Sequence, residues 1–218
     1  VFGVALKRGD PMPGVPYLPW MVMGIAPWLY MNKTTLDASK SIYQQVGLVS
    51  KMKFPINVLP SIKIMGNLYS FWTMMAFGVF LMFVNRIWPT ISWVQFIYYF
   101  ICMIALMYAL GIFNSTVSVL VRDWQIALQS LLRMLFYMSG VLFNFVTSNF
   151  PPVLVRVLEL NPFYYIINGM RESLLSKGWV WQQPNLDLTI TFWLFIFIIM
   201  VLGSYLHNKF RANFVDLI

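Results

Sequence analysis

The sequence predicts an all-α integral membrane protein, and two observations carry this prediction. The 218-residue chain is 60% hydrophobic and 10% charged, whereas a soluble domain carries about 25% charged residues. Uncharged runs of at least 21 residues also recur along the chain. So few charges cannot cover a water-facing surface, which excludes a soluble globular fold. The net charge of +8 does not indicate nucleic-acid binding, because the basic residues lie between apolar runs, as in the loops of membrane proteins.

The chain begins with a short apolar segment, Val1–Leu6, which ends at Lys7 and Arg8. Six residues are too few to cross a membrane, so we interpret residues 1–6 as the end of a truncated first span. The segment does not resemble a signal peptide, because no basic region precedes it and no small-residue cleavage site follows.

Five complete spans are predicted from the uncharged gaps, since a helix needs roughly 20 apolar residues to cross about 30 Å of hydrocarbon. The gaps cover residues 11–32, 64–85, 87–121, 134–155 and 188–208. The third gap has 35 residues, which is longer than one crossing requires. Its first part, residues 87–92, contains Pro89 and is therefore predicted to be a loop.

Residues 152–178 are predicted to form two short amphipathic helices, because the apolar stretch from Leu160 to Met170 is too short to cross the bilayer. Asn161 and Pro162 have the order expected of a helix N-cap and a first helical position. Apolar residues at helical spacing lie on both sides of this junction: Val153, Leu154, Val157 and Leu158 before it, and Phe163, Ile166, Ile167, Met170 and Leu174 after it. An interfacial or re-entrant position is the physical option for such helices.

The orientation follows from the basic residues, which favour the cytoplasmic side. One set of alternating loops (residues 33–63, 122–133 and the tail from 209) holds nine Lys and Arg, and the other set holds six. We therefore expect the loop 33–63 and the C-terminus inside, and the two short helices outside.

The predicted cytoplasmic loop contains a helical stripe. Ile42, Val46, Val49 and Met52 recur at spacings of four, three and three, and Pro55 ends the pattern. Two interpretations remain open from the residues alone. The helix either lies on the lipid surface with its lysines among the headgroups, or it docks into a soluble partner.

The sequence contains little that could perform chemistry. It has no phosphate-binding loop, one histidine (His207) and one cysteine (Cys102), so no metal site is expected and no catalytic residue is assigned. We interpret His207 as an interfacial residue and Cys102 as a packing residue. The predicted spans have no Asp, Glu, Lys or Arg in their interiors. Uphill transport would therefore draw its energy from another protein.

Three spaced motifs resemble type-2 ABC transporter permeases of the polysaccharide and polyol-phosphate exporter family, most closely the teichoic acid translocation permeases. The first is Gly47–Pro55 followed by Leu59-Pro60. The second is Leu120–Asp123, with Gln129 and Arg133 after it. The third is Asn161–Tyr165, with Arg171 after it. The similarity extends over essentially the whole chain.

The resemblance implies a six-span permease that works as a homodimer with two copies of a separate ATP-binding subunit. ATP and magnesium would lie on that partner, with no cofactor on this chain. The family places an ATPase-coupling helix at residues 39–54, which favours the docking interpretation. Its expected contacts are Ile42, Val46, Val49, Lys51, Met52, Lys53 and Phe54. The family also places the 152–178 pair at the external mouth, and implies a multi-pass protein in the cytoplasmic membrane of a Gram-positive bacterium.

The implied substrate is a teichoic acid polymer on undecaprenyl diphosphate, threaded through a channel between two protomers. Aromatic residues that could contact its sugars are Trp72, Tyr98, Phe136, Tyr137, Tyr164 and Tyr165, although aromatic residues are also ordinary constituents of membrane helices. Arg122 and Arg133 could bind the diphosphate by charge-assisted hydrogen bonds. Alternatively, Arg122 pairs with Asp123 or with lipid headgroups.

Other functions remain open. A permease for O-antigen, capsule or another polysaccharide would carry similar motifs. A passive channel or scaffold would need no ATPase. An intramembrane enzyme would need clustered His, Asp or Glu side chains, which this sequence lacks.

Overall fold

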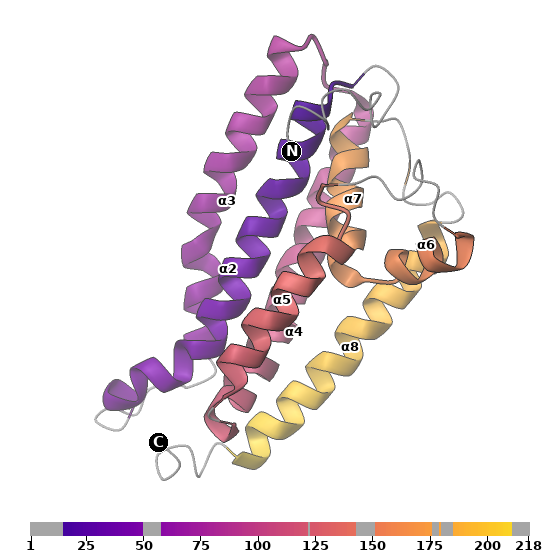
Figure 1. The fold of residues 1–218 in the computed structure, drawn as a ribbon. Coiled ribbons are helices and arrows are strands. Elements are labelled where there is room, and N and C mark those ends of the chain that lie inside the picture. The colour runs from indigo at the N-terminus through magenta and orange to yellow at the C-terminus, as the bar shows by residue number, and fades with distance from the viewer. Residues whose placement is uncertain are drawn as a thin grey trace.

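The structure is a computed structural model that describes residues 15–49, 58–121, 123–142, 151–175, 179 and 185–210. Its elements are α2 (Tyr17–Val49), α3 (Val58–Val84), η1 (Ile91–Trp93), α4 (Val94–Leu120), α5 (Trp124–Met138), α6 (Pro152–Glu159), α7 (Pro162–Leu175) and α8 (Asn185–Phe210). Within these ranges every element is helical, which confirms the predicted all-α class. Figure 1 shows a bundle in which α2 to α5 and α8 run along one axis while α6 projects sideways.

Three helical segments are long and apolar enough to cross a membrane: Val58–Val84, Ile91–Leu120 and Leu186–Phe210. They correspond to the second, third and fifth predicted spans. The other two predicted spans differ from the helices observed, so the described residues do not confirm the count of five complete spans.

Helix α2 is longer than the predicted span at residues 11–32. It continues past Lys33 without a break and ends at Val49, so its 33 residues extend about 50 Å at 1.5 Å per residue. The expectation that a loop begins at Lys33 is therefore wrong. The physical reason is that no Gly or Pro interrupts residues 28–46, so nothing stops the helix where the charges begin.

The predicted span over 134–155 is also wrong in its bounds. The observed helix α5 has 15 residues, beginning at Trp124 and ending at Met138. Gly140 follows in the left-handed region with φ 63°, a conformation that glycine adopts without a steric penalty and that commonly ends helices. Helix α5 is about 22 Å long and does not cross a 30 Å hydrocarbon layer by itself.

The two predicted short helices are present as α6 and α7, joined at Leu160 and Asn161. The Asn161 side chain accepts a hydrogen bond from the Phe163 amide at 3.0 Å, so the predicted N-cap is confirmed. Helix α7 runs antiparallel to α2, because Trp28 contacts Phe163 and Trp20 contacts Arg171. In Figure 1, α7 therefore begins near the middle of the bundle and rises to its upper end.

Small residues allow the long helices to approach closely. Gly111 of α4 lies beside Ala38 of α2 and Ile64 of α3, and Gly203 of α8 lies against the backbone of Phe113. The predicted packing residue Cys102 is fully buried in the main hydrophobic core. These contacts fix how far each helix is shifted along its neighbours.

Several predicted features lie outside the described residues: the end of the first span at 1–6, the docking residues Lys51, Met52, Lys53 and Phe54, and Arg122.

Candidate functional site

Helix α7 is attached to the bundle through Arg171, which is 1% exposed. Its Nε donates a hydrogen bond to the Trp20 carbonyl at 3.1 Å, Nη1 donates to the Gly140 carbonyl at 2.6 Å, and Nη2 donates to the Val141 carbonyl. The guanidinium also lies over the Trp20 ring, 3.7 Å from its centroid. Burial lowers the pKa of Arg171, while the carbonyls and the ring favour its charged form. One side chain thus joins α7, the start of α2 and the turn after α5.

The position of a side chain along the bundle axis, here called its height, follows from contacts between neighbouring helices. Asn67 of α3 donates a hydrogen bond to the Asp37 carboxylate of α2 at 3.0 Å, and the rings of Tyr30 and Phe71 lie 5.6 Å apart. In this antiparallel pair, Lys33 lies opposite residues 68–71. Because Phe71 is the middle residue of Val58–Val84, Lys33 lies within about 5 Å of the midpoint of that span.

A second helix gives the same height for Lys33. Ala38 of α2 lies against Gly111 of α4, and these two helices run in the same direction (Figure 1). Lys33 is therefore level with Leu106, which lies at the middle of the span Ile91–Leu120. The uncharged gap at residues 11–32 predicts Lys33 at a membrane surface, whereas Lys33 lies halfway along two spans.

The predicted substrate residue Arg133 lies at nearly the same height as Lys33. Gln125 of α5 donates a hydrogen bond to the Ser39 hydroxyl at 2.8 Å, and the rings of Trp28 and Phe136 lie 5.4 Å apart. In this second antiparallel pair Arg133 lies opposite Met31, about 3 Å along the axis from Lys33. The predicted loop at residues 122–133 is therefore wrong at Arg133, because α5 begins nine residues before it.

Lys33 and Arg133 are both exposed, on neighbouring helices. Helices α2 and α5 lie side by side toward the viewer in Figure 1, with α4 behind them and α3 on the other side of α2. We call this surface of α2 and α5 the open face. Besides the two cations, its exposed residues include Leu29, Ser130, Met134 and Tyr137.

Tyr165 is at the centre of a hydrogen-bonded aromatic group that joins α4, α7 and α8. Its hydroxyl lies 2.8 Å from the Thr189 hydroxyl and 3.2 Å from the Tyr98 hydroxyl, and its ring stacks on Phe192 at 4.6 Å. Trp193 donates a hydrogen bond to Tyr98 at 3.0 Å. Tyr165 is thus a buried packing residue in this conformation.

The six predicted sugar-binding aromatic residues do not gather at one site. Tyr164 and Tyr165 are buried, and Phe136 packs between Trp28 and Tyr137. Trp72 is half exposed on α3 beside Phe96 and Phe100, away from the open face. Tyr137 is 66% exposed and lies on the open face, one helical turn beyond Arg133.

The predicted coupling segment begins as the last three turns of α2 rather than as a separate helix. Ile42 is 1% exposed and packs with Leu59 and Val119 inside the chain, whereas its neighbour Tyr43 is 62% exposed. The backbone of Val46 and Val49 continues α2. The side chains of these two residues lie outside the described region.

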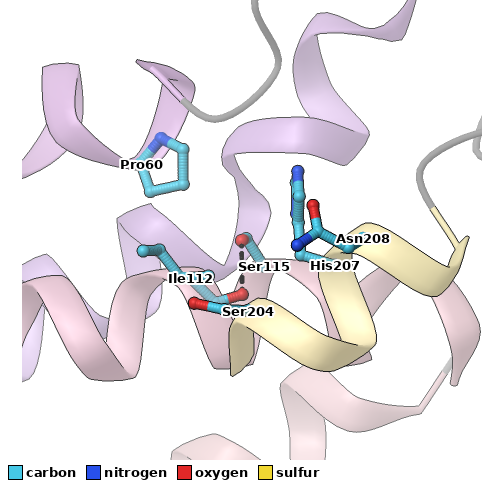
Figure 2. A pocket seen from close by; sticks show the side chains of 6 residues that line it. All are labelled: Pro60, Ile112, Ser115, Ser204, His207 and Asn208. Carbon is cyan, nitrogen blue, oxygen red and sulfur yellow. Dashed lines mark hydrogen bonds between the residues drawn. The ribbon is translucent and has the colours of Figure 1, made fainter. Parts of the chain in front are cut away.

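A pocket of about 90 Å³ lies between α3, α4 and α8 near the end of α8. Its lining residues, drawn in Figure 2, are Pro60, Ile112, Ser115, Ser204, His207 and Asn208. His207 is buried, and its Nδ1 lies 3.2 Å from the Thr116 hydroxyl. The single histidine therefore belongs to the α4–α8 contact rather than to an exposed interface.

Comparison with known proteins identifies the class of this chain. The model of the ABC-2 type transporter family matches residues 1–175. The chain belongs to this family, whose members are membrane-embedded, and three of its helices have the length and hydropathy to cross a membrane.

Two similar proteins carry the name O-antigen export system permease protein. The first, from Myxococcus xanthus, is 25% identical over 169 residues, which cover 78% of this chain and 64% of that relative. The second, from Klebsiella pneumoniae, is 22% identical over 204 residues, which cover 93% of this chain and 76% of that relative. The chain thus spans about two thirds to three quarters of the length of these relatives.

Proposed function

We propose that this chain is the membrane subunit of an ATP-driven exporter that moves a lipid-linked polysaccharide across the membrane. The observation that carries this proposal is the family match over residues 1–175, together with two relatives named as O-antigen export permeases. Export of a polar polymer needs a hydrophilic surface within the membrane. The open face, with Lys33 and Arg133 at mid-height, supplies polar groups at that depth.

The proposed complex contains two copies of this chain and two copies of a separate ATP-binding subunit, which binds ATP and magnesium. The polymer passes between the two permease copies, along their open faces. The segment 39–54 docks into the ATP-binding subunit. Because its first part is continuous with α2, movement of the docked segment is transmitted along α2 to the height of Lys33.

The proposed substrate is a glycan carried on a polyprenyl diphosphate, of the O-antigen type indicated by the relatives' names. A teichoic acid polymer in a Gram-positive bacterium is the second candidate. It is favoured by one observation, the two exposed cations on the open face, because a polyol-phosphate chain carries one negative charge per repeat while many O-antigens are neutral. The two candidates share the lipid diphosphate and differ in the polymer.

The test uses the full-length permease, purified with its ATP-binding partner and reconstituted in lipid. ATP hydrolysis is measured alone, with lipid-linked O-antigen and with lipid-linked teichoic acid. Stimulation by either polymer supports the exporter, and the stronger stimulant identifies the substrate. A complex that binds no ATPase, or whose hydrolysis responds to no lipid-linked glycan, contradicts the proposal.

The docking segment is tested in the same preparation with Val46→Asp and Met52→Asp. Each variant should keep its fold but lose polymer-stimulated hydrolysis, because a buried carboxylate disrupts an apolar contact with the partner. Lys209→Asp is the matched comparison, because Lys209 is exposed outside the segment 39–54, at the end of α8, and it should keep polymer-stimulated hydrolysis. Normal export by both Val46→Asp and Met52→Asp would show that residues 39–54 do not couple the subunits.

A further inference from the structure

Lys33 and Arg133 occupy an unusual position for charged side chains. Contacts of α2 with α3 and with α4 independently place Lys33 near the middle of two spans, and contacts of α2 with α5 place Arg133 within about 3 Å of that height. The middle of a 30 Å hydrocarbon layer is about 15 Å from water on either side. Lys33 is level with residues 68–71 of α3 and Arg133 lies about 3 Å nearer the centre, so both residues lie about 6–13 Å inside the uncharged run 64–85. Both side chains therefore leave their helices within the apolar layer.

A charge at this depth needs a polar partner or water, because an unpaired charge in hydrocarbon costs several kcal/mol. Within the described ranges, the ion pairs within 4 Å involve Arg156 only, with Glu159 and Asp187. Asp37 is one helical turn from Lys33 and accepts its hydrogen bond from Asn67. The two cations outnumber this single nearby acid, so the open face has a net positive charge at mid-height.

We infer that Lys33 and Arg133 form an anion-binding site halfway through the membrane, which holds the phosphate groups of a lipid diphosphate as it crosses. This inference rests on the proposed function and names the part of the substrate that the open face recognises. The Arg133 guanidinium offers paired donors to phosphate oxygens, while the Lys33 ammonium acts as a compact charge. Tyr137, one turn beyond Arg133, offers an aromatic ring to the adjoining sugar.

A negatively charged occupant suits this face better than an apolar one. Apolar cover would leave two buried cations without a counter-charge, which is more costly than leaving them in water. A diphosphate supplies two or more negative charges and many acceptor oxygens at one place. The site would then be filled by substrate during transport and by water between cycles.

The test measures equilibrium binding of a radiolabelled polyprenyl diphosphate to the purified permease–ATPase complex in uncharged detergent. The matching polyprenol is the uncharged probe, and phosphatidylglycerol is the competitor that carries a lipid phosphate at a headgroup. The variants are Lys33→Gln, Arg133→Gln and the double variant. Lys209→Gln is the matched control, because Lys209 is an exposed cation at the end of α8, away from the open face.

The wild-type complex should bind the diphosphate about a hundredfold more tightly than the polyprenol, the product of two roughly tenfold contributions. Each single variant should lose roughly tenfold in diphosphate affinity, the effect of one charge-assisted hydrogen bond. The double variant should bind both probes equally, and Lys209→Gln should match the wild type. Phosphatidylglycerol should compete poorly.

Three results would overturn the inference. These are a double variant that keeps the preference for diphosphate, an equal loss of that preference in Lys209→Gln, and displacement of the probe by phosphatidylglycerol at equal concentration. A fall in melting temperature of Lys33→Gln or Arg133→Gln without a change in binding would also overturn it, since the cations would then be paired with protein groups.

Export by the reconstituted complex separates the inference from the proposed function. If the wild type exports lipid-linked glycan and the double variant both binds and exports normally, the anion site is wrong and the exporter stands. If the wild type binds diphosphate through these residues but exports no glycan, the site stands and the exporter is wrong.

Discussion

Gly24 of α2 and Arg171 of α7 share one small space, because the Arg171 guanidinium lies where a Cβ on Gly24 would be. The missing side chain lets the guanidinium reach the Trp20 carbonyl and the Gly140 carbonyl together. Glycine at position 24 of α2 is therefore required for the buried guanidinium of Arg171 on α7.

Gly24→Ala should destabilise the protein by about 2 kcal/mol or more, because displaced guanidinium donors leave buried carbonyls unsatisfied at about 1–3 kcal/mol each. Gly66→Ala is the matched control, since a Cβ at Gly66 meets nothing within 4 Å. It should be neutral or stabilise α3 by up to about 1 kcal/mol. Thermal unfolding of the purified protein measures both. Equal melting temperatures for the two variants would contradict the assigned role of Gly24.

Arg171→Lys should also lower the melting temperature, although it preserves the charge. A single ammonium cannot serve three carbonyls on two segments in the way that the planar guanidinium does. We expect a loss of about 1–3 kcal/mol for the unsatisfied groups. Arg156→Lys is the comparison, because Arg156 forms only partly exposed ion pairs and should change stability by less than about 1 kcal/mol.

Gly169→Ala should push α7 away from α4, since its Cβ would overlap the Tyr99 ring. The contact can be isolated in a double-mutant cycle with Tyr99→Ala, which removes the ring. Each single variant should destabilise the protein, and the double variant should cost less than their sum by about 0.5–3 kcal/mol. Additive effects in thermal unfolding would show that the two residues do not interact.

Tyr165→Phe should cost about 1 kcal/mol, the net contribution of a typical hydrogen bond, because its hydroxyl lies within hydrogen-bonding distance of Thr189 and Tyr98. Tyr137→Phe removes the same atom from an exposed ring and should stay within about 0.5 kcal/mol of the wild type. Chemical unfolding resolves the difference. A larger loss for Tyr137→Phe would mean that the Tyr137 hydroxyl is covered in the protein studied.

The sequence was sufficient for the features that local chemistry determines. The junction at Asn161 and Pro162 predicted the α6–α7 pair, because a capping residue before a proline is a local signal. The length and hydropathy of α3, α4 and α8 predicted spans for the same reason. Gly140 was an available signal for the early end of α5, since glycine often follows a helix C-terminus.

The site itself could not be predicted from the sequence, because the positions of Lys33 and Arg133 along the bundle axis depend on contacts between distant segments. The charge pattern predicts the start of a loop at Lys33, and only the register of α2 against α3 and α4 places this residue at mid-depth. The partners of Arg171 lie 30, 31 and 151 residues away along the chain. No spacing pattern reveals contacts over such separations.

The break between α5 and α7 has a mechanical consequence. A continuous helix resists twisting through an unbroken ladder of backbone hydrogen bonds, whereas α5 and α7 are two half-length rods that meet near the middle of the bundle (Figure 1). In the described region their junction is held by the bonds of Arg171 to the Gly140 and Val141 carbonyls and of Asn161 to the Met138 carbonyl. A rotation of α5 about its axis therefore reaches α7 through these few side-chain hydrogen bonds, and α5 and α7 can rotate by different amounts.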